Sequence, residues 1–428
     1  MNAANESTLT SRKCRYWPRI SLRTLLILVA VLGIGLGFIG NFWNNLQKKR
    51  HAIALVNGGG GRVHYSYQFG YDDDLRTPMR HFTTVSSREV DGRLERTITT
   101  SLGTKVDYAQ PPGPRILRWF LGDNAFAHVN GIAFGWSDSP LPLEPQILAH
   151  FPELKVVWLH QEQMDPQWLK ECASVSKLYA LQLQGDEKTT VTGGDLAQFA
   201  SAKELKLMGC SGDWVNDEIV AAVGKLQQLE SVQILTAPNV TSAVFQDLAQ
   251  LPELRSLDII RCKGIDDVGG TPLAKLQQLH TLQLMYTSVG DRTMEAIGGL
   301  NNLECVFLSG TNVGDAGATH IAKLIQLKCL ALDRTKITDE GVHALAPLKQ
   351  LRILNLHQTP ITDSSLTTIA QFSELESLSL SACPAIQSAS FLQLRALTNL
   401  RSLRVGKQIT EEDLSELKLA LPNCNVYD

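Results

Sequence analysis

The pattern L-x-x-L-x-L, with other apolar residues allowed at the leucine positions, recurs twelve times between residue 129 and the C-terminus. Successive copies begin 24 to 27 residues apart. This regular spacing indicates that the chain repeats one small structural unit, which cannot bury its own apolar residues alone. The copies must therefore stack and share a continuous core. They begin at Val129, Leu154, Leu178, Ala202, Leu229, Leu254, Leu279, Leu303, Leu327, Leu351, Leu375 and Leu400.

Each copy predicts one strand followed by one helix. The alternation within L-x-x-L-x-L has the period of a strand, so the leucines share one face and the residues between them share the other. After a turn, an aspartate stands at or just inside the start of a helical segment. Stacked units of this kind predict an α/β solenoid over residues 129–428, with a curved parallel sheet inside and helices outside. In the four clearest copies the aspartates are Asp291, Asp315, Asp339 and Asp363.

A small residue, cysteine or threonine, stands three positions after the last leucine of the strand in seven copies. Copies such as LHTLQLMYTSVGD from Leu279 and LRILNLHQTPITD from Leu351 resemble the leucine-rich repeat family, and the resemblance covers residues 129 to 428. That family usually places Asn, Cys or Thr here, where the side chain can hydrogen-bond the backbone of the neighbouring coil. The resemblance therefore implies that the three cysteines are buried, reduced and structural. The seven residues are Cys210, Cys262, Thr287, Thr311, Thr335, Thr359 and Cys383.

Cysteine usage argues against a disulfide-held or Cys-x-x-Cys protein. Eight cysteines in 428 residues are too sparse for a disulfide scaffold, and no Cys-x-x-Cys pair is present for zinc or redox chemistry. Cys305 and Cys329 occupy equivalent positions on adjacent strands, opposite the leucines, which predicts a separation of about 5 Å. A disulfide between neighbouring parallel strands would be strained, so two free thiols are the preferred interpretation.

An uncharged stretch, TLLILVAVLGIGLGFIGNFW, runs from Thr24 to Trp43 and is long enough to cross a bilayer as a helix. It predicts an uncleaved signal-anchor, a transmembrane helix at residues 24–43. Five basic residues precede the span and four follow it closely, so residues 1–23 are predicted to be cytoplasmic and the repeats to lie outside the cytoplasm. A cleaved signal peptide is disfavoured because apolar residues continue to Trp43. A buried helix of a soluble domain is disfavoured because nothing polar interrupts the stretch.

The region between the span and the repeats predicts a small linker region and a cap. Residues 44–111 are predicted to form a linker or small α+β region. An apolar cluster in residues 112–128 is suited to cap the first repeat, and a last helix from Glu411 to Leu421 with a final strand in LPNCNVYD closes the other end. Short strands are predicted at residues 62–69, 81–86 and 94–100.

Motifs and charge argue against an enzyme and against nucleic-acid binding. The formal net charge is −3, and basic residues alternate with acidic ones on the predicted concave face. No zinc-protease, hydrolase or dinucleotide-binding motif is present, so we predict no catalytic residue, no metal site and no cofactor. The alternative is an enzyme with a site in residues 57–128 that the repeats direct to a target. Its candidate groups are Tyr65, Tyr67, Asp72 to Asp74 and His81.

The order of parts along the chain is a basic start, an uncharged span, a glycine-terminated helix, a tyrosine-rich strand and the repeats. This order is similar to that of the membrane-anchored leucine-rich-repeat proteins common in planctomycete bacteria. The resemblance implies a tethered binding module without chemistry. We expect a monomeric solenoid whose concave sheet face binds another protein or a cell-envelope polymer.

The concave face is predicted to carry an apolar row, formed by the residue directly after the last leucine in four consecutive copies. Tyr286 and Phe307 lie beside one end of this row, and polar residues two positions earlier in the strands surround it. A methionine- and aromatic-rich centre with a polar surround is typical of a protein-binding patch, unless turns cover it. Neither Met285 nor Phe307 belongs to the leucine pattern, so both are expected to be replaceable without unfolding. The row is Met208, Leu235, Ile260 and Met285, and the polar residues are Gln182, Gln233, Asp258 and Gln283.

Overall fold

The computed structural model describes most of the repeat region and parts of the segment before it. The predicted span at residues 24–43 and the predicted cap at residues 112–128 lie outside the described residues. The described residues are 44–55, 62–65, 84–90, 93–100, 103–109, 129–133, 144–211, 214–407 and 409–427.

The chain divides into two compact units, Met1–His51 and Ala52–Asp428. A helix occupies residues 44–55. Within the described ranges, no helix is both long enough and apolar enough to span a membrane. The single-pass topology therefore stays a prediction.

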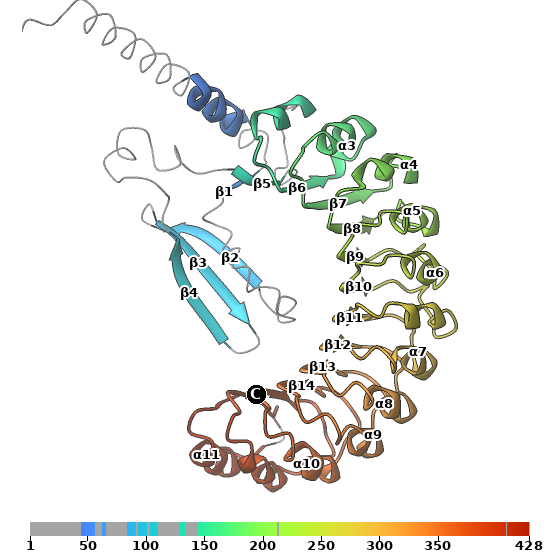
Figure 1. Cartoon of the computed structure of the whole chain (residues 1–428). Helices are drawn as coiled ribbons and strands as arrows, with labels where there is room; N and C mark the ends of the chain where they lie inside the picture. Colours follow the sequence, from blue (N-terminus) through green and yellow to red (C-terminus); the bar gives the residue numbers. More distant parts are fainter. Residues whose placement is uncertain are drawn as a thin grey trace, which may run out of the picture. The chain divides into compact units, whose positions relative to one another are not determined.

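One sheet of fourteen strands runs through the second unit (Figure 1). From β5 to β17 each strand pairs in parallel with the next, which confirms the predicted parallel sheet. β1, which corresponds to the strand predicted at residues 62–69, pairs antiparallel with β5 at the edge. The strands are β1 (Arg62–Tyr65), β5 (Val129–Ala133), β6 (Val156–His160), β7 (Ala180–Asp186), β8 (Glu204–Ser211), β9 (Ser231–Leu235), β10 (Ser256–Ile260), β11 (Thr281–Gln283), β12 (Cys305–Phe307), β13 (Cys329–Ala331), β14 (Ile353–Asn355), β15 (Ser377–Ser379), β16 (Ser402–Arg404) and β17 (Asn425–Tyr427).

Short helices follow the strands and lie along the outer side of the curved sheet (Figure 1). The last helix and the last strand occur where the sequence predicts them. The α-helices are α3 (Pro166–Ala173), α4 (Gly193–Leu196), α5 (Asp217–Val223), α6 (Val244–Leu248), α7 (Asp291–Ile297), α8 (Asp315–Ile321), α9 (Asp339–Ala344), α10 (Asp363–Ile369) and α11 (Glu411–Ala420). The 3₁₀ helices are η3 (Pro145–His150), η4 (Gln161–Gln163), η5 (Ala197–Phe199), η6 (Thr271–Lys275) and η7 (Ser388–Ala396).

A second sheet of three antiparallel strands precedes the repeats in sequence. Its strands are β2 (Thr84–Val90), β3 (Arg93–Thr100) and β4 (Gly103–Ala109), joined by two short connections. The first two overlap the strands predicted at residues 81–86 and 94–100. The third was not predicted, although Val106 and Tyr108 alternate with charged residues as they would in a strand.

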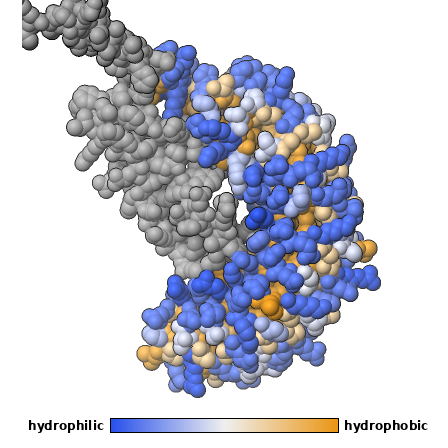
Figure 2. Space-filling model, in the orientation of Figure 1, coloured by the Kyte–Doolittle hydropathy of each residue, from blue (hydrophilic) through white to orange (hydrophobic). Residues whose placement is uncertain are grey.

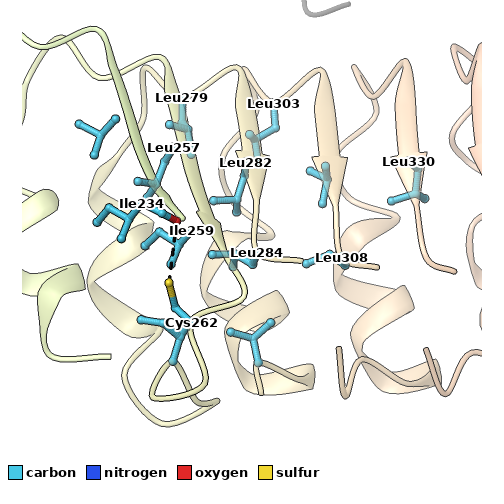
Figure 3. Packing of buried hydrophobic residues seen from close by; sticks show 14 of the residues in the cluster. Ile234, Leu257, Ile259, Cys262, Leu279, Leu282, Leu284, Leu303, Leu308 and Leu330 are labelled. Atoms are coloured by element: carbon cyan, nitrogen blue, oxygen red, sulfur yellow. Dashed lines mark hydrogen bonds between the residues drawn. The ribbon is translucent and has the colours of Figure 1, made fainter. Parts of the chain in front are cut away.

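The leucine positions of the repeats form one continuous core. Leu282, Leu284, Leu308 and Leu330 have no exposed surface and point into the space between sheet and helices (Figure 3). Burying a leucine side chain contributes roughly 1.5–3 kcal/mol. Because each leucine contacts the next repeat as well as its own, the free energy comes from stacking, as the repeat pattern predicts.

The aspartates that begin the helices bond to the following repeat. The helices start at the aspartate itself, so the residue lies just inside the helix, as predicted. Its carboxylate, however, accepts hydrogen bonds from backbone N–H groups one repeat further along. The donor–acceptor pairs are Gly314 N to Asp291 Oδ1 at 2.8 Å, Thr338 N to Asp315 Oδ1 at 2.8 Å, Thr362 N to Asp339 Oδ1 at 2.9 Å and Gln387 N to Asp363 Oδ1 at 2.8 Å.

Asp267 makes the same connection from the turn before η6. It accepts hydrogen bonds from Gly290 N at 2.8 Å, Thr293 N at 2.8 Å and the Thr293 hydroxyl at 2.8 Å. Burial raises the pKa of Asp267, but hydrogen bonds from Thr293, Gly290 and Arg292 outweigh that effect and hold the pKa below its ordinary value. The folded protein therefore favours the ionised carboxylate.

The cysteine and threonine positions behave differently from each other. The threonines donate to a carbonyl of their own repeat, as in Thr287 Oγ1 to Leu284 O at 2.6 Å, so the expected bond to the neighbouring coil is wrong for them. The cysteines do reach the preceding repeat: Cys262 Sγ lies 3.8 Å from Ile234 O (Figure 3), and Cys383 Sγ lies 3.1 Å from Leu356 O. Both are buried free thiols, as predicted. The side chain of Cys210 lies outside the described part.

Candidate functional site

The face of the large sheet opposite the leucines presents three rows of side chains, one residue of each row per strand. The strand register defines the rows. The first row is Val156, Ala180, Glu204, Ser231, Ser256, Thr281, Cys305, Cys329 and Ile353. The central row is Trp158, Gln182, Lys206, Gln233, Asp258, Gln283, Phe307, Ala331 and Asn355. The third row follows the last leucine position and runs through His160, Gln184, Met208, Leu235, Ile260, Met285, Ser309, Asp333, His357 and Ser381.

The predicted apolar row is part of the third row. Met208 pairs with Leu235, and Leu235 pairs with Ile260. Met285 continues the line, because its carbonyl accepts a hydrogen bond of 3.0 Å from Arg261 N. Leu235, Ile260 and Met285 are half-buried, and the side chain of Met208 lies outside the described part. The three described side chains thus form a partly accessible apolar strip.

Phe307 does not lie at the surface beside this row. Its side chain is 2% exposed and belongs to a small apolar cluster, separate from the leucine core, with Cys305, Cys329 and Ile353. Met285 packs against this cluster from the side. Phe307→Asp is therefore expected to disturb the fold, contrary to the expectation from the sequence, because a carboxylate there would be buried among apolar groups.

Asp258 and Gln283 are also buried, so they do not form the exposed polar surround that the sequence predicts. Burial raises the pKa of Asp258 to about 7, an effect that hydrogen bonds from Ser256, Gln233 and Gln283 and the charge of Lys206 offset only in part. Asp258 therefore takes up a proton near neutral pH. It is the centre of a buried polar group and not a rim residue.

Tyr286 lies at the edge of the concave face, next to Met285, and is 36% exposed. The Arg261 guanidinium carbon lies 5.4 Å from the centre of the Tyr286 ring, in a cation–π contact. On the other side, a Cβ at Gly310 would come within 2.6 Å of the ring, so this glycine makes room for it. The sequence identified Tyr286 but not Arg261. The available signal was its position two residues after Ile259, the last leucine position of its copy, which is the position that Tyr286 has after Leu284.

The edge that carries these residues has a repeated backbone conformation. Six non-glycine residues there have φ between 55° and 57°, in the left-handed region that side chains disfavour. All six are exposed. In the view of Figure 2, the described surface is mainly hydrophilic, with scattered hydrophobic spots. The six are Thr236, Arg261, Tyr286, Arg334, Gln358 and Ala382, and Gly310 has the same sign of φ.

A hydrogen-bonded polar network adjoins the apolar cluster, and the sequence analysis missed it. Asp333 accepts hydrogen bonds from Ser309 Oγ at 2.5 Å and Asn355 Nδ2 at 2.8 Å. His357 Nδ1 lies 2.6 Å from Ser381 Oγ. Asp333 contacts Asn355 and not the imidazole, so the described side chains do not form the order of an acid–base–nucleophile triad. The network makes this part of the face polar and ordered.

Cys305 and Cys329 are register partners on β12 and β13, as predicted, and both are buried free thiols. A hydrogen bond with Cys329, burial and neighbouring charge raise the pKa of the Cys305 thiol well above its ordinary value. Among the residues for which the structure gives a placement, no three His, Cys, Asp or Glu side chains are positioned to hold a metal ion.

The family model described as leucine-rich repeat region matches residues 232–423. Comparison with curated protein sequences gives no match. Similar solved structures include an internalin from Listeria monocytogenes, 17% identical over 73% of this chain and 93% of that chain, with a TM-score of 0.48. They also include an internalin C2 from the same organism, 24% identical over 50% and 84% with a TM-score of 0.37, and a leucine-rich-repeat protein of Leptospira interrogans, 17% identical over 67% and 93% with a TM-score of 0.39.

Proposed function

We propose that this protein, which belongs to the leucine-rich repeat family, binds another protein through the concave face and edge of its sheet. The observation that carries the proposal is the group formed by Ile260, Arg261, Met285 and Tyr286. It combines a half-buried apolar strip with an exposed tyrosine that an arginine and a glycine hold in place.

Tyrosine and arginine are the residue types that most often carry binding energy at protein interfaces. The Tyr286 ring is already positioned by Arg261 and Gly310, so a partner would lose little side-chain entropy on docking. Adjacent Met285 offers an adaptable apolar contact. The polar network around Asp333 borders this group and supports a polar boundary for the interface.

The test is capture of a partner from membranes of the source cell by the immobilised full-length chain. Wild type is expected to retain one protein in stoichiometric amount. Tyr286→Ala and Arg261→Ala are expected to reduce the affinity about ten-fold or more, because hot-spot truncations cost more than about 1–2 kcal/mol. His343→Ala, on the exposed outer side of α9, is the matched control. Unchanged affinity in both concave-edge variants, at unchanged melting temperature, would contradict the proposal.

We also propose that residues 24–43 anchor the chain in a membrane with the repeats outside the cytoplasm. The support is the uncharged length of the segment and the excess of basic residues before it. The chain is expected to stay with membranes in carbonate and high salt and to leave them in detergent. Protease added to intact spheroplasts is expected to remove the repeats, and protection of the repeats would reverse the topology.

The described side chains do not include the groups on which the enzyme alternative depends. Tyr65 lies in β1, where only the backbone is described, and His81 lies outside the described residues.

A further inference from the structure

The concave face has a depression over β6 to β9, away from the group around Tyr286. Its volume is about 250 Å³. Two of the four first-row residues here are small: Ala180 and Ser231 line the depression and leave space that larger side chains would fill. The central row forms its other side with Trp158, Gln182 and Lys206.

The charges of the lining residues cancel. Glu204 and Lys206 both line the depression, and they are two positions apart on the same face of β8. Burial lowers the pKa of Lys206, an effect that the charge of Asp258 opposes. A charged ligand would therefore meet both signs and gain little net Coulomb energy, whereas a neutral ligand would not have to give up a charged hydration shell.

The polar groups are a mixed set of donors and acceptors. Gln182 and Gln233 are amides with donors and an acceptor, Ser231 is a hydroxyl, Glu204 accepts and Lys206 donates. The Gln233 side chain also hydrogen-bonds Asp258, so only its remaining polar capacity serves a ligand. A sugar hydroxyl is itself both donor and acceptor, so several hydroxyls on one ring can be satisfied by such a set at once. The indole of Trp158 adds a flat apolar surface, which suits the C–H face of a pyranose ring.

We propose that this depression binds a neutral sugar residue of a glycan chain. Its volume is slightly below the range of about 300–1,000 Å³ for pockets that enclose drug-sized ligands, which fits one unit of a longer molecule. The depression is lined from β6 to β9, whereas the proposed protein-binding group lies at the ends of β10 and β11. Sugar binding can therefore be tested independently of protein binding.

The experiment is calorimetric titration of the full-length chain with maltotetraose, cellotetraose and chitotetraose, and with tetragalacturonate as an anionic comparison. At least one neutral tetrasaccharide is expected to bind with a Kd below about 10 mM. Titrations with glucose and N-acetylglucosamine show whether the ligand is a free sugar or a polymer. A polymer-binding site is expected to have a lower Kd for the tetrasaccharide than for its monosaccharide.

Variants place the binding in the depression. Ala180→Trp is expected to abolish it by filling the space, and Trp158→Ala is expected to weaken it about ten-fold by removing the stacking surface. His343→Ala, on the exposed outer side of α9, is the control and is expected to leave saccharide binding unchanged. The proposal is overturned if no neutral tetrasaccharide binds, if tetragalacturonate binds more tightly than all of them, or if Ala180→Trp keeps its fold and full affinity.

Discussion

Asp315 and Thr338 are joined twice across the boundary between two repeats. The Asp315 carboxylate accepts a hydrogen bond from Thr338 N at 2.8 Å and another from the Thr338 hydroxyl at 2.7 Å. It also accepts one from Gly341 N at 3.0 Å. One carboxylate thus satisfies the N–H of the N-cap residue Thr338 and that of Gly341 in the first turn of α9, where N–H groups have no partner within their own helix.

Asp315→Ala is expected to lower the free energy of unfolding by about 1–3 kcal/mol, because it leaves partly buried N–H groups of the next repeat without an acceptor. Glu340→Ala is the control. Glu340 is exposed in the first turn of α9, the helix that Asp315 caps, and the variant is expected to change the free energy of unfolding by less than about 0.5 kcal/mol. Urea unfolding at neutral pH measures both. Equal stability of the two variants would mean that the inter-repeat bond contributes nothing.

Asp267 predicts how the fold responds to acid. Its pKa in the folded protein lies below the ordinary value, so its contribution to stability is present above the pKa of the unfolded chain, about 4, and is lost as the pH falls through the folded pKa. Wild type is expected to be more stable than Asp267→Asn at pH 6, with the difference narrowing below about pH 4. Chemical denaturation at each pH tests this, and a difference independent of pH would count against it.

Asp258 predicts the opposite slope near neutrality. Its folded pKa of about 7 lies above that of the unfolded chain, so the native state holds its proton more tightly, and stability falls as the pH rises from about 4 to about 7. Asp258→Asn keeps a similar shape without the charge and is expected to gain stability relative to wild type at pH 8, by up to about 4 kcal/mol, but little at pH 4. Glu295→Gln on the exposed side of α7 is the control. A gain equal at both pH values would show that the carboxyl is not protonated on folding.

Cys262→Thr is expected to be mild, within about 1.5 kcal/mol, because threonine occupies the equivalent place in the neighbouring repeat and can donate to a carbonyl of its own repeat. Cys262→Phe is expected to cost about 1–3 kcal/mol or more, since the site has no exposed surface and no space for a ring. Thermal unfolding of the two variants provides the comparison. If the phenylalanine variant had the same melting temperature as wild type, the site of Cys262 would not be enclosed as described.

The thiols of Cys305 and Cys329 are expected to resist alkylation in the folded protein. Both are buried, and the pKa of Cys305 is raised, so little thiolate is present to react. Mass spectrometry after brief iodoacetamide treatment resolves each cysteine separately, with Cys424, which is only partly buried, as the internal comparison. Rapid labelling of Cys305 before unfolding is the contrary result.

Residue spacing was enough to predict the strands of the repeats, their parallel sheet and which face each of their residues occupies. It could not predict depth on the concave face. Phe307 and Asp258 both lie on that face as predicted, yet both are buried, because burial depends on the size of side chains one and two repeats away. Spacing also located the aspartates at the helix starts. It could not predict that the Asp315 carboxylate accepts hydrogen bonds from the start of the next helix, α9, because that depends on how the repeats pack.

The direction of the aspartate bonds makes the two ends of the solenoid unequal. Asp165, Asp186 and Asp195, in the first described repeats, accept hydrogen bonds from groups of their own repeat. From Asp217 onward, several carboxylates, such as that of Asp315, accept hydrogen bonds from the coil after them. Under a pull along the stack, the described early coils are held to each other by fewer such ties, and their resistance depends on strand pairing and core packing instead. The later coils would come apart together, since opening one junction removes the cap from the next helix.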